Sequence, residues 1–533
     1  MSTIYLDYAA TTPVDPRVAA AMAQALADPD AQANPASATH GPGLAASDRV
    51  EAARAQVAAL IGATPREIIF TSGATEANNL ALLGVAHAAR RASGRGHIVS
   101  SRTEHKSVLD TCRQLEREGF AVTLIEPDST GRVSADAARA ALRADTLLLS
   151  LMLANNEIGV LSDIAAIAET CRARGVLIHT DASQAVGKIP VDVTRLGVDL
   201  LSLTAHKFYG PKGIGALYVR ETVRPRIAPI QFGGGHERGL RSGTLPTHQI
   251  LGLGVAAEIA RTQGAADAAH ARDLAARLWR ELEPIPGALL NGHPEFRVPG
   301  LMNVSFAGVE GESLITGLPG IAVSSGSACS SATREPSYVL RSLGRSTELA
   351  QSSLRLSLGR FTTAADVDEA ATAIRAEVGR LHVLAGAPAP PGEHLRVTGA
   401  AELESAHGSL MARTLSPLTR RYFLAPARVP EFPEGVPPPE VRHGRAGRQA
   451  EGTAVFFELR TGDGIVKSAR FSAYGCPHTL AVVAWLCEVL EGRRREAGIP
   501  GAPADWARQF EVPAEKLGRL LIVEDALRAA FDL

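Results

Sequence analysis

Two apolar runs of the chain end in residues that could do chemistry together. Asp181 ends a predicted strand in VLIHTDASQAVG (176–187), and the run that ends at Thr204 is followed by Ala205-His206-Lys207. The carboxyl ends of parallel strands are where α/β sheets gather their ligand-binding residues. A lysine amine can hold pyridoxal phosphate as a Schiff base, and a carboxylate can keep the pyridine nitrogen of that cofactor protonated. A surface lysine and a capping aspartate explain either residue alone, so the interpretation depends on the residues around them.

Polar residues also follow other predicted strands. The turn Thr71-Ser-Gly-Ala-Thr-Glu76 leads into a helix, so its N–H groups and hydroxyls could hold a phosphate, although a ligand-free capped turn explains it equally. His105 opens a helix, where a structural cap is the commoner role. Asn155-Asn156-Glu157 leaves an apolar run, which favours a site over a core. Arg355 alternates with apolar residues and needs a carboxylate, from the protein or from an amino-acid substrate.

Cys329 differs in its surroundings from the other cysteines. Small polar residues flank it in Val323-Ser-Ser-Gly-Ser-Ala-Cys-Ser-Ser-Ala332, whereas Cys112, Cys171 and Cys487 fall in apolar predicted elements. Structural cysteines are mostly buried among apolar residues, while reactive thiols are accessible. Cys329 is therefore the best candidate for a nucleophilic thiol.

The composition sets limits on the class of protein. The chain has 533 residues, 55 basic and 56 acidic side chains and 45% hydrophobic residues, which suggests three or four folding units at roughly 150 residues each. A net charge of −1 argues against a global binder of nucleic acid. The longest apolar run, Thr146–Ala154, is far shorter than a membrane helix, and residues 1–7 contain no signal-like segment. Five cysteines without a CxxC pair suggest a reduced, soluble, cytoplasmic protein.

Strand-like and helix-like segments alternate between residues 65 and 220. Strands are predicted at Glu67–Thr71, His97–Ser101, Ala121–Glu126, Leu147–Leu153, Val176–Asp181, Leu200–Thr204 and Gly215–Val219, with helices at Ala74–Arg90, His105–Glu118, Ser134–Arg143, Asp163–Arg174 and Asp192–Leu196. This alternation predicts a mainly parallel α/β sheet. Long helices are expected over 246–283, and residues 300–380 mix strands and helices as a smaller α+β lobe would.

The composition changes after residue 385. GAPAPPGEH (386–394) is typical of a linker, and a second loose stretch is expected at 426–450. An alternating hairpin then follows at Thr453–Thr461 and Ile465–Tyr474, with helices at Pro477–Glu491 and 514–531. The sequence therefore predicts a separate C-terminal domain of about 120 residues.

These residues belong to longer stretches that resemble a known family. About 385 residues resemble the cysteine desulfurases of the iron–sulfur cluster assembly type. The stretches include YLDYAATTPVDPRV, TSGATEANNLA, TEHKSVLDTCRQLEREGF, NNEIGV, HTDASQAVGKIPVD, AHKFYGPKGIGALYVR, GGGHERGLRSGTLP, VSSGSACSSA and LRLSLGRFTT. The resemblance implies a homodimeric fold-type I pyridoxal phosphate transferase that converts L-cysteine to L-alanine and leaves the sulfur as a persulfide. It implies a large domain at about 15–260 and a small domain from the N-terminal arm and about 261–385.

The resemblance also implies a role for each matching residue. Lys207 matches the Schiff-base lysine, Cys329 the persulfide-forming cysteine and His105 the histidine that stacks on the cofactor ring. The other matches are Asp181 at the pyridine nitrogen, Gln184 and Asn156 near the ring hydroxyl, Ala74, Thr75, Thr204 and His206 at the phosphate, Thr244 reaching across from the partner subunit, and Asn34 and Arg355 at the substrate carboxylate. The implied partners are L-cysteine and sulfur-acceptor proteins such as iron–sulfur scaffolds, without nucleic acid or a membrane.

The tail, residues 409–533 after a linker at 386–408, resembles the scaffold proteins of iron–sulfur assembly more moderately. Scaffolds of that family hold their cluster with three cysteines and an aspartate. Only Cys476 stands in place here, because the other positions fall on Ala450, Gly452 and about Arg519. One thiolate cannot hold a cluster, and His478 is expected to be a cap or surface residue, so no metal is predicted. A degenerate scaffold domain could be a sulfur acceptor through Cys476, a docking surface or an interaction relic.

Two alternatives remain at this point. A selenocysteine lyase would share the fold and the cofactor, although the Ser-rich segment around Cys329 favours the desulfurase. In a second alternative, the tail is a binding module that captures partners while the catalytic part only supplies sulfur.

Overall fold

The computed structural model describes residues 3–28, 33–93, 96–325, 336–386, 414–426 and 441–532. Cys329 lies outside the described residues, and so does all but the first residue of the predicted linker 386–408.

A seven-stranded sheet forms the centre of the larger part of the molecule. Its strands are β2 (Ile68–Thr71), β3 (His97–Ser101), β4 (Ala121–Ile125), β5 (Thr146–Ser150), β6 (Leu177–Asp181), β7 (Leu200–Thr204) and β8 (Gly215–Val219), in the order β2-β8-β7-β6-β5-β3-β4. The neighbours from β7 through β4 are parallel, whereas β8 is antiparallel to both β7 and β2. The predicted strands and the mainly parallel sheet are thereby confirmed.

Helices cover both faces of this sheet. They are α1 (Pro16–Ala27), α2 (Gly41–Leu60), α3 (Ala74–Ser93), α4 (Lys106–Arg117), α5 (Ala135–Ala141), α6 (Ile164–Arg172) and α7 (Val193–Leu196). Ser134, Asp163 and Asp192 cap α5, α6 and α7 by accepting hydrogen bonds from first-turn N–H groups. Successive strand residues enter different apolar clusters: Leu148 packs on one face and Leu149 on the other. Burial on both faces explains why the strands are continuously apolar.

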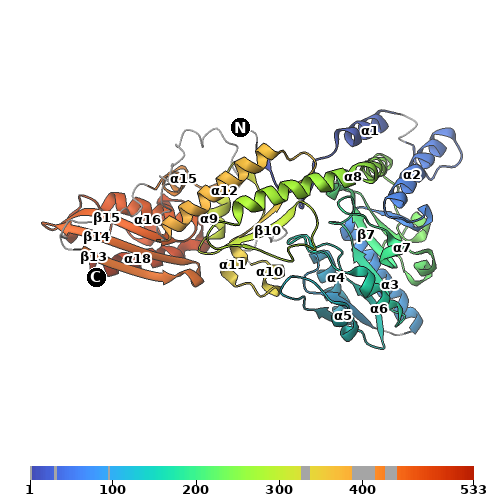
Figure 1. The fold of residues 1–533 in the computed structure, drawn as a ribbon, viewed down its shortest axis with the longest axis horizontal. Helices are drawn as coiled ribbons and strands as arrows, with labels where there is room; N and C mark the ends of the chain where they lie inside the picture. Colours follow the sequence, from blue (N-terminus) through green and yellow to red (C-terminus); the bar gives the residue numbers. More distant parts are fainter. Residues whose placement is uncertain are drawn as a thin grey trace.

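A smaller lobe follows the long helix α8 (Thr247–Leu282), which leads out of the large sheet region (Figure 1). The lobe contains an antiparallel sheet of β9 (Ala288–Leu290), β10 (Leu301–Phe306) and β12 (Ser353–Ser357), together with α9 (Gly311–Thr316), α10 (Tyr338–Ser342), α11 (Thr347–Gln351) and α12 (Ala364–Leu384). The N-terminal strand β1 (Ile4–Tyr5) pairs with β11 (Ile321–Ala322) in this lobe. The arm that continues from β1 therefore runs from the small lobe toward the large sheet.

The tail is an antiparallel sheet with helices. Its elements are α15 (Pro417–Leu424), β13 (Val441–Arg448), β14 (Thr453–Gly462), β15 (Ile465–Tyr474), α16 (Pro477–Leu490), α17 (Pro503–Gln509) and α18 (Leu517–Phe531). The expectation of a loose stretch over 426–450 is wrong for 441–448, which pair with β14 along their whole length. The sequence does not reveal this strand because its residues are polar and it contains a glycine, Gly444. A glycine is needed there because the backbone of α18 approaches closely, and a Cβ would be 1.9 Å from the Ala526 carbonyl oxygen.

The tail packs end-on against the small lobe, opposite the large sheet (Figure 1). One continuous apolar cluster includes Leu314 and Leu381 of the small lobe as well as Phe423, Phe471 and Leu480 of the tail. Arg380 of α12 donates to the Phe423 carbonyl at 2.8 Å and lies over its ring. Among the helices that the structure describes, none has the length and apolar character needed to cross a membrane.

Candidate functional site

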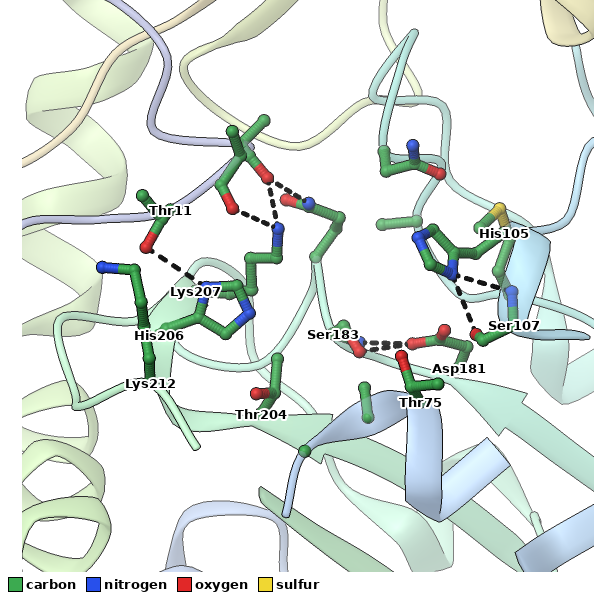
Figure 2. Close-up of a pocket in the computed structure, with 18 of the residues that line it drawn as sticks. Thr11, Thr75, His105, Ser107, Asp181, Ser183, Thr204, His206, Lys207 and Lys212 are labelled. Carbon is green, nitrogen blue, oxygen red and sulfur yellow. Dashed lines mark hydrogen bonds between the residues drawn. The ribbon is translucent and has the colours of Figure 1, made fainter. Parts of the chain in front are cut away.

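Lys207 lies in a pocket at the carboxyl ends of β6 and β7. A short turn, Ala205–Lys207, follows β7 directly, and the lysine Nζ donates to the carbonyl oxygens of Ala9 (2.6 Å) and Ala10 (2.7 Å) in the N-terminal arm. The pocket has a volume of about 600 Å³. In Figure 2, Lys207, His206 and Lys212 occupy one side of the pocket, and His105 and Asp181 the other.

Asp181 ends β6 and is held by three donors. Oδ1 accepts from the backbone N–H (2.9 Å) and the hydroxyl (2.6 Å) of Ser183, and Oδ2 accepts from the Asn78 amide at 2.8 Å. These three hydrogen bonds hold the carboxyl group in one orientation on the pocket wall.

His105 precedes α4 and faces the pocket. Its Nδ1 accepts from the Ser107 N–H at 3.1 Å and lies 2.8 Å from the Ser107 hydroxyl (Figure 2). Because Nδ1 is an acceptor, the neutral ring carries its proton on Nε2.

The beginning of α3 forms another part of the pocket. Ser72, Gly73, Ala74 and Thr75 line it, so the first N–H groups of a 20-residue helix lie at the pocket. The Thr204 hydroxyl is a neighbour, because a Cβ on Gly73 would lie 3.7 Å from it.

Two basic residues complete this end. Burial, followed by the charges of Lys207, Lys212 and Lys188, lowers the pKa of His206 to about 4, so its ring is neutral near pH 7. The ring lies 3.2 Å from the Thr11 hydroxyl. Lys212 also lines the pocket and is exposed.

Gln184 and Asn156 lie on the wall between these groups. The Gln184 amide donates to the Ala9 carbonyl at 2.8 Å, the same oxygen that Lys207 contacts. The Oδ1 atom of Asn156 is buried and has no hydrogen-bond partner. The pocket thus keeps an acceptor that no described residue satisfies.

Arg355 on β12 brings a buried guanidinium to the same pocket. Its side chain is 3% exposed and donates to Asp7 (2.8 Å) and to the Asn156 carbonyl (3.1 Å). The Nε atom is buried without a partner among the described residues. An internal carboxylate, that of Asp7, therefore pairs with Arg355, as one of the two sequence alternatives expected, and the substrate-binding alternative stays a prediction.

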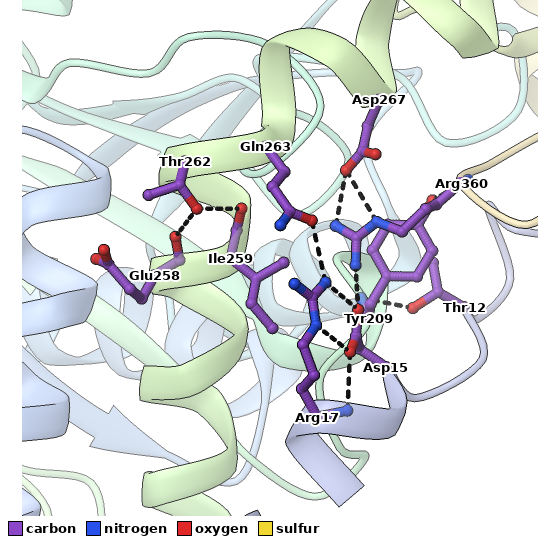
Figure 3. Close-up of polar contacts among 10 residues, drawn as sticks. All are labelled: Thr12, Asp15, Arg17, Tyr209, Glu258, Ile259, Thr262, Gln263, Asp267 and Arg360. Carbon is purple, nitrogen blue, oxygen red and sulfur yellow. Dashed lines mark hydrogen bonds and ion pairs between the residues drawn. The ribbon is translucent and has the colours of Figure 1, made fainter.

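A polar cluster braces the turn that carries Lys207 (Figure 3). Tyr209 has a φ of 68°, and the guanidinium of Arg360 lies over its ring. The backbone N–H of Arg360 donates to the tyrosine hydroxyl at 2.6 Å. Arg360 pairs with Asp15 (2.5 Å) and with Asp267 (2.7 Å) of α8. These contacts fix an unfavourable backbone conformation two residues after Lys207.

Asn34 and Thr244 are not brought into the pocket of a single chain. Both are exposed, and neither is among the residues that line it. Other pocket residues had no separate signal in the sequence: Lys212, Ser107 and Ser183, with Asn78 and Asp7 acting behind them. Their hydroxyl, amide and carboxylate groups fall within the matching stretches, but only the fold shows which ones meet.

The pocket suits pyridoxal phosphate. A helix N-terminus, hydroxyls and basic side chains offer a seat for the phosphate, Asp181 a partner for the ring nitrogen, and Lys207 an amine. The unsatisfied Asn156 Oδ1 and Arg355 Nε are buried polar atoms of the kind that a bound group would satisfy.

Comparison with known proteins gives the same outline. The Aminotransferase class-V family matches residues 4–370. Proteins named cysteine desulfurase IscS from Aeromonas salmonicida and Cronobacter sakazakii are 59% identical over 379 residues and 57% identical over 381 residues. These matches cover 71% and 72% of this chain and 93% and 94% of the relatives.

Solved structures agree. A NifS-like protein superposes with a TM-score of 0.65 at 36% identity, covering 70% of this chain and 98% of its own. SspA in complex with cysteine gives 0.59 at 37%, covering 67% and 99%, and DndA from Streptomyces lividans gives 0.56 at 39%, covering 65% and 97%. In each case the similarity spans nearly the whole of the other protein.

Proposed function

This chain belongs to the aminotransferase class-V family and is a pyridoxal phosphate-dependent cysteine desulfurase, and from that premise we propose how its residues divide the work. The relatives favour this activity over the selenocysteine lyase alternative. The observation that carries the assignment of roles is the meeting of Lys207, Asp181, His105 and the start of α3 around one pocket.

The cofactor would be held by residues in four roles. Lys207 would attach it, Asp181 would pair with its ring nitrogen, and the first residues of α3, the Thr204 hydroxyl and His206 would hold its phosphate. Gln184 and Asn156 serve the ring hydroxyl, and Asn156 has a free acceptor for that purpose. When bound, pyridoxal phosphate withdraws electrons from Cα of an amino-acid substrate, which makes its proton removable.

The substrate would be positioned by Arg355 and deprotonated by Lys207. Arg355 retains a buried donor for a carboxylate, in addition to its pair with Asp7. Lys207 Nζ donates to carbonyl oxygens of the arm, and it would take a proton at Cα once it leaves them. His105 Nε2 carries a proton that it can donate, because Ser107 holds Nδ1 as the acceptor.

Cys329 would take the sulfur. The Cβ–S bond of L-cysteine breaks as a bond forms between that sulfur and Cys329 Sγ. The electron pair of the broken bond goes to Cβ, which takes up a proton to give L-alanine, and Cys329 keeps a persulfide. Its segment of small polar residues supports this role.

A homodimer is proposed from surface features of the single chain. Thr244 and Asn34 match site residues yet lie outside the pocket, so a second subunit is needed to bring Thr244 to it. Phe232, in the segment leading to Thr244, is 78% exposed, which suits a surface that a second copy covers. We also propose a cytoplasmic enzyme that hands sulfur to iron–sulfur cluster assembly, because its sequence resembles the desulfurases of that type.

The domain limits are proposed as 1–385 for the desulfurase, 386–408 for the linker and 409–533 for a degenerate scaffold-like domain. The tail has its own three-stranded sheet. His478 corrects one expectation about it: the side chain is 4% exposed and its Nδ1 lies 3.3 Å from Lys516 Nζ, so it is not a surface residue.

Mass spectrometry after incubation with L-cysteine tests the proposed roles. We expect a persulfide on Cys329, and we expect Cys329→Ala to retain the absorbance of the bound cofactor while forming no persulfide there and releasing no sulfide. Lys207→Ala should lose covalent cofactor attachment. Sulfide release by Cys329→Ala with cysteine as the only thiol would overturn the assignment of Cys329.

A further inference from the structure

Lys188 is a charged residue of the site region that the proposed mechanism does not use. It stands four residues after Gln184, in a helical turn where Lys188 N donates to the Ala185 carbonyl at 3.0 Å. Residues four apart in such a turn lie on the same face. The lysine Nζ accordingly donates to Gln184 Oε1 at 2.6 Å.

The two ends of the Gln184 amide thus have different partners. Lys188 can only donate from its ammonium, so it requires the oxygen of the amide. The Ala9 carbonyl can only accept, and the amide nitrogen donates to it at 2.8 Å. Because both neighbours demand the same orientation, a flip of the amide would put two acceptors together and two donors together.

This orientation leaves one amide N–H of Gln184 for the pocket. The NH2 group has two hydrogens, and the Ala9 carbonyl takes one. Gln184 lines the same pocket as Asp181 and Lys207. A remaining donor there suits an oxygen of the bound cofactor.

Lys188 is also linked to Lys207 through the arm. Gln184 and Lys207 both donate to the Ala9 oxygen, at 2.8 and 2.6 Å. When Lys207 leaves that oxygen, the Gln184 contact still holds the arm in place. Burial first, and then the charges of Lys207 and Arg355, lower the pKa of Lys188 to about 7. A neutral Lys188 amine keeps N–H donors for Gln184 Oε1 but can also accept, so the ammonium form is the one that enforces the orientation of the amide.

The turn that carries Lys188 packs closely against the residue that follows Lys207. Gly187 has a φ of 78°, and a Cβ there would lie 2.5 Å from Cβ of Phe208, the residue after Lys207. On its other side, Lys188 lines a second cavity of about 820 Å³ together with Asp192, Arg195 and Arg261. Lys188 therefore stands between the cofactor pocket and that cavity.

We propose that Lys188 is a positioning residue, which fixes the Gln184 amide so that its nitrogen side faces the oxygen of the cofactor ring. The inference rests on the proposed function, because it takes the ligand of the pocket to be pyridoxal phosphate. It adds a residue that acts through Gln184 and does not touch substrate.

The test measures pyridoxal 5′-phosphate binding to the cofactor-free full chain and the absorbance maximum of the loaded protein. Lys188→Met keeps the length of the side chain but removes the donor, and should weaken cofactor binding by about three- to tenfold, the value of one lost hydrogen bond, and shift the maximum. Lys188→Arg keeps N–H donors, so most of the cofactor affinity and the original absorbance maximum should be retained. Arg195→Met is the matched control, because it removes a cation from the same cavity and leaves the Gln184 hydrogen bonds with Lys188 and Ala9 in place.

A double-mutant comparison shows whether the effect passes through Gln184. In a Gln184→Ala background, Lys188→Met should change neither the affinity nor the absorbance maximum further. Unchanged values in Lys188→Met alone, equal losses in Lys188→Arg, or a full effect without Gln184 would each overturn the proposal. Failure of the unaltered chain to bind pyridoxal phosphate would instead refute the proposed function.

Discussion

Two carboxyl groups behind the residues that line the pocket are buried, and burial raises the pKa of both. Glu157, directly after Asn156, is 3% exposed, and burial raises the pKa of its carboxyl to about 7, against the lowering effects of Ser337, Arg355, His105 and Lys106. The Ser337 hydroxyl donates to it. Glu104 is wholly buried, and burial likewise raises the pKa of Glu104 well above its ordinary value. The site therefore holds protonatable acids behind the residues that line it.

Glu157 makes stability depend on pH. The unfolded carboxyl titrates near 4.5 and the folded one near 7, so between these values the folded chain binds more protons than the unfolded chain. Stability from this group is therefore present below about pH 4.5 and is lost as the pH rises through 7. Glu157→Gln stays neutral and keeps an acceptor for Ser337. It should raise the melting temperature relative to the unaltered protein at pH 8 but not at pH 5. The gain in the free energy of unfolding at pH 8 should be up to about 3 kcal/mol.

Glu116→Gln provides the control for this experiment, because Glu116 is exposed on α4. Thermal unfolding of the cofactor-loaded protein at both pH values gives the comparison. An identical difference between Glu157→Gln and the unaltered chain at pH 5 and pH 8 would contradict the assigned pKa direction.

At the scale of elements, the turn after β6 and the turn after β7 are in close contact at Gly187. Gly187 and Gly175 both have a left-handed backbone, with φ of 78° and 65°. A Cβ at Gly187 would meet Phe208, whereas a Cβ at Gly175 would have no atom within 4 Å. Alanine substitutions at these two glycines therefore separate the cost of a left-handed backbone from the cost of a steric clash.

We expect Gly175→Ala to cost about 1 kcal/mol, from the left-handed conformation alone. Gly187→Ala adds a clash at the Lys207 turn, so it should lower the melting temperature more and also weaken pyridoxal phosphate binding, which Gly175→Ala should leave unchanged. Melting temperature and cofactor affinity are the two measurements. Equal effects of the two substitutions would show that the turns are not coupled.

The sequence predicted elements where burial imposes a pattern and missed them elsewhere. The strands of the large sheet are covered on both faces, so their apolar runs were visible. β13 pairs fully with β14, but its exposed polar residues carry no such pattern. At the site, the strand ends predicted Asp181 and Lys207. Asp7 could not be assigned to Arg355, 348 residues away, because only the tertiary fold makes that contact.

At the scale of the whole molecule, direct side-chain contacts hold the tail against the small lobe. Lys516 pairs with Glu312, Arg519 Nη1 lies 3.6 Å from Glu310, and the Ser313 hydroxyl donates to the Gly475 carbonyl at 2.8 Å. Burial and the neighbouring Glu312 raise the pKa of Glu310. Cys476 follows Gly475 and is 0% exposed. The thiol that stands in place of a scaffold ligand is therefore closed off while the tail is docked.

This arrangement bears on the three roles considered for the tail. A sulfur acceptor must present its thiol, which the docked tail does not do. The charged contacts and the shared apolar cluster hold the tail against the small lobe of its own chain. Transfer to Cys476 would require the tail to open, so the strength of the contacts at Glu310 and Glu312 decides whether its thiol can react.

Thiol labelling measures that opening. Glu312→Lys places two cations together without altering the tail itself, and should raise the alkylation rate of Cys476 by at least about tenfold, since breaking a largely buried ion pair costs more than 1.4 kcal/mol. The exchange Glu312→Lys with Lys516→Glu should restore protection. Cys487, buried inside the tail, reports whether the tail stays folded, and Cys112 and Cys171 report the same for the large sheet. Rapid labelling of Cys476 in the unaltered chain, with Cys487 still protected, would show that the tail is open in solution and would return Cys476 to the candidate sulfur acceptors.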